Sequence, residues 1–153
     1  MPGIHEVHLL PWSAEQMFDL VADVRRYPEF LPWVVATRVR SDSESEMIAD
    51  MLIGFNALRE KFTSRVIKQR PAGIEVIYLD GPMRDLDNNW TFRPLPDGSC
   101  EVDFCVEFTF RNALFERLAG QYFERAFRRM VAAFEQRAAE LYGNSSSSAT
   151  SAA

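Results

Sequence analysis

The feature that most constrains the fold of this chain is an alternation of apolar and polar residues between residues 33 and 110. It is clearest from Cys100 to Phe110, where every second residue is apolar. A period of two is typical of strands with one buried face. The sequence predicts six such strands, with these inward-facing residues: Val35, Thr37 and Val39; Ala49, Met51, Ile53 and Phe55; Phe62, Ser64 and Val66; Ile74, Val76 and Tyr78; Leu86, Asn88, Trp90 and Phe92; and Cys100, Val102, Phe104, Val106, Phe108 and Phe110.

The breaks between these strands carry the residues that favour turns. They are Ser-Asp-Ser at 41–43, Arg-Pro-Ala-Gly at 70–73, Gly-Pro at 81–82 and Pro-Asp-Gly at 96–98. Because parallel pairing needs long crossover connections, strands joined by such short turns form an antiparallel meander.

Helical patterns lie on both sides of the meander. After a predicted strand at 3–10, Ser13 and Gln16 have the spacing of a capping box for a first helix, and a short second helix is expected over 25–31. Asn112 is expected to cap a continuous helix that runs to about Tyr142 and stops at Gly143, a span of about 46 Å. One face of this long helix holds Phe115, Ala119, Phe123, Ala126, Phe127, Met130, Phe134 and Leu141.

These elements predict an α+β fold. The economical way to bury the apolar faces is a curved antiparallel sheet of about seven strands wrapped around the long C-terminal helix, with the two short helices at one end. The chain has 153 residues, of which 47% are apolar and 25% charged, so one domain over residues 1–143 is expected. Residues 144–153, mostly Ser and Ala, are expected to form a disordered tail.

Composition also bears on location and partners. No apolar run approaches the roughly 18 residues of a membrane span, and no signal peptide is visible. Cys100 and Cys105 are five residues apart in one strand, hence on opposite faces, which fits a reducing cytoplasm. The net charge of −5 argues against nucleic acid as the default partner.

Two stretches are nevertheless basic. Residues 59–70 and 111–137 hold clusters of Arg and Lys that could be ordinary solvated faces or could contact phosphates of lipid or RNA. The candidates for membrane or RNA contact are Arg59, Lys61, Arg65, Arg125, Arg128 and Arg129.

No catalytic motif is present. GxSxG, P-loop and GxGxxG sequences do not occur, and the acids Asp85 and Asp87 belong to a stretch rich in acids that solvated strand edges explain. His5 and His8 lie three residues apart in a predicted strand, so they face opposite sides and cannot share a metal. The sequence therefore predicts neither a catalytic group nor a metal centre.

The aromatic and methionine content instead points to a soft apolar interior. The chain has 12 Phe, 3 Trp, 4 Tyr and 6 Met. Most of these residues are expected in the core, but Phe30 with Trp33, Phe55 with Leu58, and Met83 lie at three separate turns. Apolar side chains on turns are either further core or the rim of a ligand pocket.

Several motifs together resemble one family. Residues 27–33, Tyr-Pro-Glu-Phe-Leu-Pro-Trp, look like the signature of the coenzyme Q-binding proteins of the START superfamily, which includes bacterial ribosome-association toxins. Segments 13–24, 59–66, 81–92 and 134–143 match that family in the same order. The resemblance spans nearly residues 3–143; a Met at position 83 departs from the aromatic that is common there.

The resemblance implies a helix-grip fold and a non-catalytic protein that binds ubiquinone or a related polyprenyl lipid in support of respiration. The quinone is then a ligand, and no cofactor is implied. The expected entrance is formed by Phe30, Trp33, Phe55, Leu58, Met83 and Phe123, and the interior by Phe62, Trp90, Phe127, Met130 and Phe134. Ser64 and Asn88 are expected either to hydrogen-bond a quinone carbonyl or to bond each other.

Two alternatives come with the family. One is a toxin that binds the large ribosomal subunit and blocks translation initiation, with the basic residues in contact with ribosomal RNA. The other is a cyclase or aromatase, since such enzymes use the same fold. The expected location is the cytoplasm, with contact at the surface of the inner membrane.

Overall fold

The computed structural model of the chain describes residues 3–55 and 58–143, apart from the side chains of residues 55, 58, 115 and 118–120. The expected tail at 144–153 lies outside the described residues. In chain order the elements are β1 (Gly3–Leu10), α1 (Ala14–Ala22), the 3-10 helix η1 (Val24–Glu29), β2 (Val34–Asp42), β3 (Glu46–Phe55), β4 (Leu58–Gln69), β5 (Gly73–Asp80), β6 (Met83–Pro94), β7 (Cys100–Phe110), α2 (Ala113–Arg128) and α3 (Met130–Tyr142).

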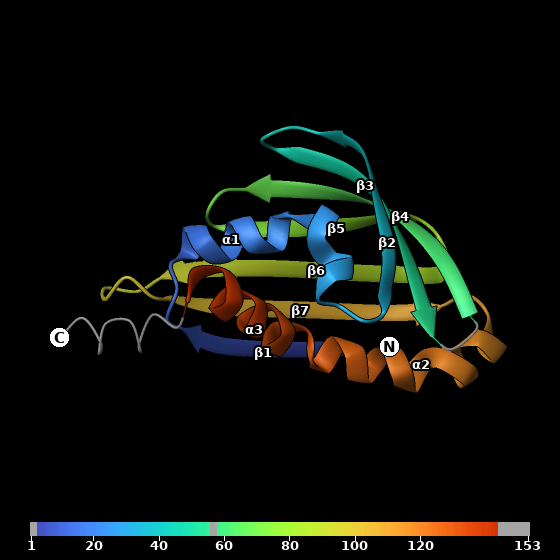
Figure 1. Cartoon of the computed structure of the whole chain (residues 1–153). Helices are drawn as coiled ribbons and strands as arrows, with labels where there is room; N and C mark the ends of the chain where they lie inside the picture. Colours follow the sequence, from blue (N-terminus) through green and yellow to red (C-terminus); the bar gives the residue numbers. More distant parts are fainter. Residues whose placement is uncertain (1–2, 56–57, 144–153) are drawn as a thin grey trace.

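The strands form one antiparallel sheet in the order β1-β7-β6-β5-β4-β3-β2. Its strands turn steeply from β1 at one edge to β2 at the other, and the helices lie across one face (Figure 1). The predicted helix-grip architecture is therefore confirmed. The meander runs from β2 to β7, and β1 joins it by pairing with β7, so the N-terminal strand forms an edge.

Strand β7 carries the largest share of the inner face. All six of its predicted inward side chains are buried, from Cys100 to Phe110. The residues between them, such as Glu101, Asp103 and Cys105, remain partly exposed on the outer face. The alternation predicted for this strand is confirmed.

Strand β2 departs from the predicted alternation at its start. Val35 was expected on the inner face, but its side chain is 43% exposed, while Val34 is buried. The pairing of β2 with β3 shifts register between Val34 and Ala36 and again between Val39 and Ser41. A bulge adds one residue to its strand and so changes which side chains point inward. Thr37 and Val39, beyond the first bulge, are partly buried as expected.

The first helix begins as its sequence predicts. The Ser13 hydroxyl accepts a hydrogen bond from the Gln16 backbone N–H at 3.0 Å, and the Gln16 side chain accepts one from the Ser13 N–H at 2.9 Å. These bonds satisfy two of the donors that a helix N-terminus leaves open. Next to this cap, the Trp12 indole donates to the Gly143 carbonyl at 2.8 Å, which ties the start of α1 to the end of α3.

The long C-terminal helix is not continuous, contrary to the prediction. It divides at Arg129 into α2 and α3, and the Arg129 N–H bonds both the Arg125 and the Ala126 carbonyls at 3.2 and 3.1 Å. The division re-aims the helix, so that α2 packs on β7 while α3 also reaches α1. Leu141 is 49% exposed instead of buried, and Val131 and Ala138 are buried in α3 together with Phe134.

None of the described helices has the length and apolar character needed to cross a membrane. The strongest amphipathic pattern belongs to α2, whose apolar face meets the sheet.

Loss of the capping box provides a test of the N-terminal region. Ser13→Ala removes one acceptor and should lower the free energy of unfolding by about 1 kcal/mol. The measurement is urea denaturation, where the midpoint should fall with an unchanged m-value. Ser41→Ala on the exposed part of β2 is the control and should shift stability by less than about 0.5 kcal/mol. Equal effects of the two substitutions would contradict the role of the cap.

Candidate functional site

An apolar cavity of about 90 Å³ lies between the inner face of the sheet and the helices. Strands β2 to β7 contribute the wall on the side of the sheet, and α1, η1, α2 and α3 contribute the other. Of the residues predicted to bind a ligand, those that line this cavity are Trp33, Phe62, Ser64, Met83, Asn88, Trp90, Phe123, Phe127, Met130 and Phe134. Met83 and Phe123, expected at the entrance, are each 2% exposed and lie inside.

The remaining predicted residues lie elsewhere. Phe30 lines an outer groove and not the cavity. The side chains of Phe55 and Leu58 lie outside the described part of the chain, although their backbones pair at the end of the β3–β4 ladder.

Other cavity-lining residues were not assigned to the site from the sequence. They include Tyr27, Leu31, Met51, Phe104 and Val106. Tyr27 and Leu31 both belong to the Tyr-Pro-Glu-Phe-Leu-Pro-Trp run, which was therefore a usable signal for these two residues. Phe104 and Val106 followed the predicted inward alternation, but nothing in that pattern separates a cavity wall from solid core.

Ser64 and Asn88 are two polar side chains on an otherwise apolar surface. The Asn88 amide nitrogen donates to the Cys105 backbone carbonyl at 2.9 Å. Among the hydrogen bonds of the described residues, none joins Ser64 to Asn88, so the expected bond between them is not formed. The Asn88–Cys105 hydrogen bond uses neither the Asn88 amide oxygen nor the Ser64 hydroxyl. Both groups are therefore available to a polar group in the cavity.

The two tyrosines near the cavity are held neutral. Burial raises the pKa of Tyr27, and the nearby charge of Asp23 raises it further. Its hydroxyl donates a short hydrogen bond to the Val21 carbonyl. Burial likewise raises the pKa of Tyr78, although the Met83 N–H, which donates to the Tyr78 oxygen at 2.9 Å, acts in the opposite direction. Among the described residues that line the cavity, no carboxylate, His, Cys, Lys or Arg occurs.

A wider groove of about 720 Å³ lies outside the cavity. The loop after η1 forms one side with Phe30, Pro32 and Trp33, and the helices form the other with Tyr122, Arg125, Ala126, Arg129, Ala132, Ala133 and Gln136. Trp33 borders both spaces, so its indole is part of the wall between them. The floor of the groove is apolar, while Arg125 and Arg129 are exposed.

Phe134 holds the wall of the cavity together. Its ring is edge-on to those of Tyr27, Phe30 and Trp90, at centroid distances of 5.4, 5.1 and 5.2 Å. The Arg137 guanidinium lies 5.2 Å above the Phe30 ring and pairs with Glu29. The Pro-flanked segment is therefore fixed to α3 by aromatic and ionic contacts.

The cavity is small for a ligand. A cavity of about 150 Å³ with aliphatic and aromatic walls takes up a single benzene ring. At about 90 Å³ this interior is below that size. A larger guest enters only if side chains move, and Met51, Met83 and Met130 are the flexible ones in the wall.

The basic residues form two outer surfaces. Arg59, Lys61 and Arg65 lie on the exposed face of β4, where Arg65 pairs with Glu46 at 2.9 Å. Arg125, Arg128 and Arg129 lie on the exposed side of the α2–α3 junction, and Arg128 pairs with Glu124 at 3.0 Å. Neither surface opens into the cavity.

Comparison with known proteins agrees with this architecture. A family model described as polyketide cyclase/dehydrase and lipid transport matches residues 10–135. The chain belongs to this family. The match covers the segment from the end of β1 to α3, which contains the cavity, so the resemblance read from the motifs is confirmed.

Relatives within the family carry two kinds of name. The chain is 40% identical over 135 residues to the ribosome association toxin RatA of Pseudomonas aeruginosa, covering 88% of this chain and 94% of the relative. It is 34% identical over 142 residues to the mitochondrial coenzyme Q-binding protein COQ10 homolog B of Xenopus laevis, covering 90% of this chain and 58% of the relative.

Solved structures show the same fold. An 18 kDa protein from Caulobacter crescentus superimposes with a TM-score of 0.72 at 38% identity, covering 94% of this chain and 99% of that one. The Zhui aromatase/cyclase from a Streptomyces species superimposes with a TM-score of 0.77 at 14% identity, covering 90% of this chain and 93% of that one. At that low identity the second likeness concerns the fold alone.

The central position of Phe134 can be tested by truncation. Phe134 is 1% exposed and contacts three aromatic rings. Phe134→Ala should lower the free energy of unfolding by about 3–5 kcal/mol, because it removes a buried ring and enlarges the cavity. Leu141→Ala, at an exposed position of the same helix, is the control and should change stability by less than about 0.5 kcal/mol. Denaturant unfolding measures both; a loss below about 1 kcal/mol for Phe134→Ala would show that the ring does not support the wall.

Proposed function

We propose that this protein is a non-catalytic carrier that binds a polyprenyl quinone, such as ubiquinone, in the internal cavity. The observation that carries the proposal is the wall of the cavity: apolar side chains from the sheet and the helices surround two polar groups, Ser64 and Asn88. A quinone has the same division, with two carbonyl oxygens on a ring and a long hydrocarbon tail. The name of the COQ10 relative supports the same ligand class.

Physical chemistry explains why such a ligand needs a carrier. Each buried CH₂ group gains about 0.8 kcal/mol, so a polyprenyl tail does not cross water unaided. The Ser64 hydroxyl can donate to a quinone carbonyl, while the neutral, apolar wall excludes ionised ligands. Since the cavity is narrow when closed, binding should displace methionines and the Trp33 wall. The outer groove then accommodates the part of the tail that does not fit inside.

Absence of acid–base chemistry in the described wall supports a carrier over an enzyme. A cyclase or aromatase needs a group that moves a proton, and the described wall offers only the Tyr27 hydroxyl, whose pKa is raised, a serine and an amide. We also propose that the protein works in the cytoplasm, in transient contact with the inner membrane. The exposed cations of β4 would face the anionic headgroups there.

Tryptophan fluorescence offers a direct test of quinone binding. Trp33 and Trp90 line the cavity, whereas Trp12 lies beside Gly143. In a Trp12→Phe background, titration with a short-chain ubiquinone should quench the remaining emission and saturate at one quinone per chain. Ala49→Leu narrows the cavity and should weaken binding at least ten-fold, while Ala36→Leu on the exposed side of β2 should not. Linear, unsaturable quenching that is equal in all variants would refute a quinone site.

A second function is favoured by the relatives named as ribosome association toxins, at 34–40% identity. The exposed arginines at the α2–α3 junction are the surface that could contact phosphates of ribosomal RNA in the large subunit. Arg125 and Arg129 also border the outer groove, so a tail seated there and ribosomal RNA would meet at the same surface, while the internal cavity lies apart from it.

Sucrose-gradient profiles distinguish this second function. Overproduction of the protein should reduce the 70S peak if it blocks subunit joining, and the effect should weaken with rising salt. Arg125→Gln with Arg129→Gln should restore the peak, while Arg38→Gln with Arg84→Gln, two exposed arginines on the sheet, should not. An unchanged 70S peak with the unaltered protein would reject ribosome association and leave the carrier proposal standing.

A further inference from the structure

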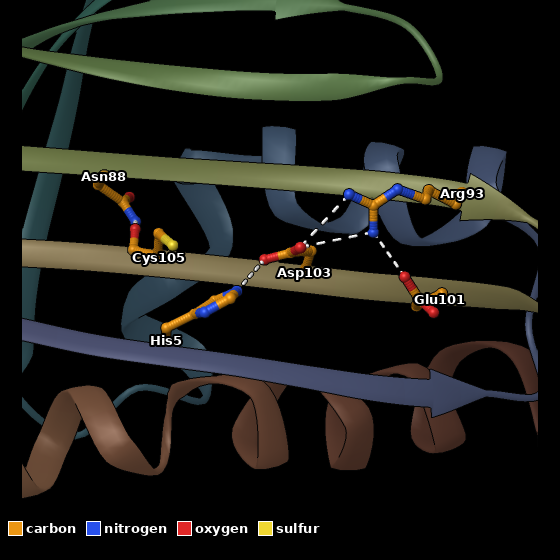
Figure 2. Close-up of polar contacts among 6 residues, drawn as sticks. All are labelled: His5, Asn88, Arg93, Glu101, Asp103 and Cys105. Carbon is orange, nitrogen blue, oxygen red and sulfur yellow. Dashed lines mark hydrogen bonds and ion pairs between the residues drawn. The ribbon is translucent and has the colours of Figure 1, made fainter.

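Three metal-ligating side chains gather on the outer face of the sheet, on the side opposite the cavity. His5 lies on β1 directly across from Cys105 on β7, and Asp103 precedes Cys105 by two residues on the same face. His5 Nε2 is 2.8 Å from Asp103 Oδ1, and the donor atoms of all three residues lie within 4.8 Å of one another. Figure 2 shows the side chains of His5 and Asp103 meeting between the two strands, with Cys105 beside them.

Strand pairing creates this group, and spacing along the chain does not reveal it. His5 and Asp103 are 98 residues apart in sequence. The motif analysis considered His5 only with His8, and the two face opposite sides of β1; His8 instead contacts Glu6 at 3.3 Å. Cys105 was considered only with Cys100, which is buried on the inner face. The register of β1 against β7 instead brings His5 and Cys105 next to each other and next to Asp103.

The donor set favours zinc over other common divalent ions. One nitrogen, one carboxylate oxygen and one sulfur suit Zn²⁺, whereas Mg²⁺ and Ca²⁺ prefer oxygen alone. With bond lengths of about 2.0–2.3 Å, the donors of a tetrahedral zinc lie about 3–4 Å apart. Side-chain rotations that move the donor atoms by about an ångström bring the observed separations to that geometry.

We propose that His5, Asp103 and Cys105 bind a zinc ion that clips the edge strand β1 to β7, with water in the fourth position. On binding, the proton that His5 Nε2 donates to Asp103 is replaced by one on Nδ1, so that the Nε2 lone pair binds the metal, and the Cys105 thiol releases one proton to solvent.

The surroundings of the group support a cation there. The carboxylates of Asp103 and Glu107 place negative charge beside Cys105, and this charge attracts a metal ion. Arg93 holds Asp103 from its other side, since its guanidinium donates to Asp103 Oδ2 at 3.4 Å. The same guanidinium donates to Glu101 Oε1 at 2.5 Å. The contact between Arg93 and Oδ2 orients the Asp103 carboxylate so that its Oδ1 faces His5.

Cobalt(II) is the probe, because a cobalt–thiolate bond gives a charge-transfer band in the near ultraviolet. Untagged full-length protein, stripped with a chelator and kept reduced with a phosphine, should take up one cobalt per chain, develop this band, and lose it when zinc is added. Cys105→Ser should abolish the band, and His5→Gln and Asp103→Asn should weaken binding at least ten-fold. His8→Gln, on the same strand but the opposite face, should bind as the unaltered protein does.

Two outcomes would overturn the proposal. One is the absence of stoichiometric cobalt or zinc uptake by the reduced protein; the other is binding that persists unchanged in both Cys105→Ser and His5→Gln. Circular dichroism of each variant establishes that it is folded before binding is measured. Because the site and the cavity are on opposite faces of the sheet, neither outcome bears on quinone binding.

Discussion

The need to cover one apolar face of a curved sheet governs this structure. Strand β7 alone places six buried side chains on that face, and its neighbours β1 and β6 extend the surface on either side. The strands turn steeply across the sheet, and the C-terminal helix that covers them is divided in two (Figure 1). The break at Arg129 lets α2 follow β7 while α3 reaches α1, and the Trp12–Gly143 bond fixes the far end. The cavity is the space that remains where this cover does not fill the curve completely.

Most of the fold could be predicted from the sequence because the patterns that indicate it are local. Alternation in β7, the Ser13–Gln16 capping box and the Gly143 stop each depend on residues close together in the chain, and each was confirmed. Errors arose where tertiary geometry intervened. Val35 is exposed because a bulge in β2 changes the alternation. Leu141 is also exposed, and the prediction that it is buried was wrong because it extended the helical periodicity through a break that no Pro or Gly marks.

The site was only partly accessible to the same reasoning. Strand alternation placed Ser64 and Trp90 on the correct face, and helical periodicity placed Phe134 there, where all three line the cavity. This reasoning could not give the depth of Met83 at the start of β6, which depends on tertiary packing, or place Phe30 in the outer groove, which depends on how the Pro-flanked segment packs on α3. Nor could it pair His5 with Asp103, because that contact follows from the register of strands at opposite ends of the sequence.

The bulges of β2 also distinguish the two borders of the sheet. An edge strand with regular, unpaired backbone groups is a template on which another chain can add a strand. The register shifts at Val34 and Val39, together with the exposed Arg38 and Arg40, make β2 too irregular and too charged for that role. At the other border, β1 keeps unbroken register with β7, and α2 and α3 lie alongside it. The two edges of the sheet are thus protected in different ways, and both arrangements oppose the addition of a strand from another chain.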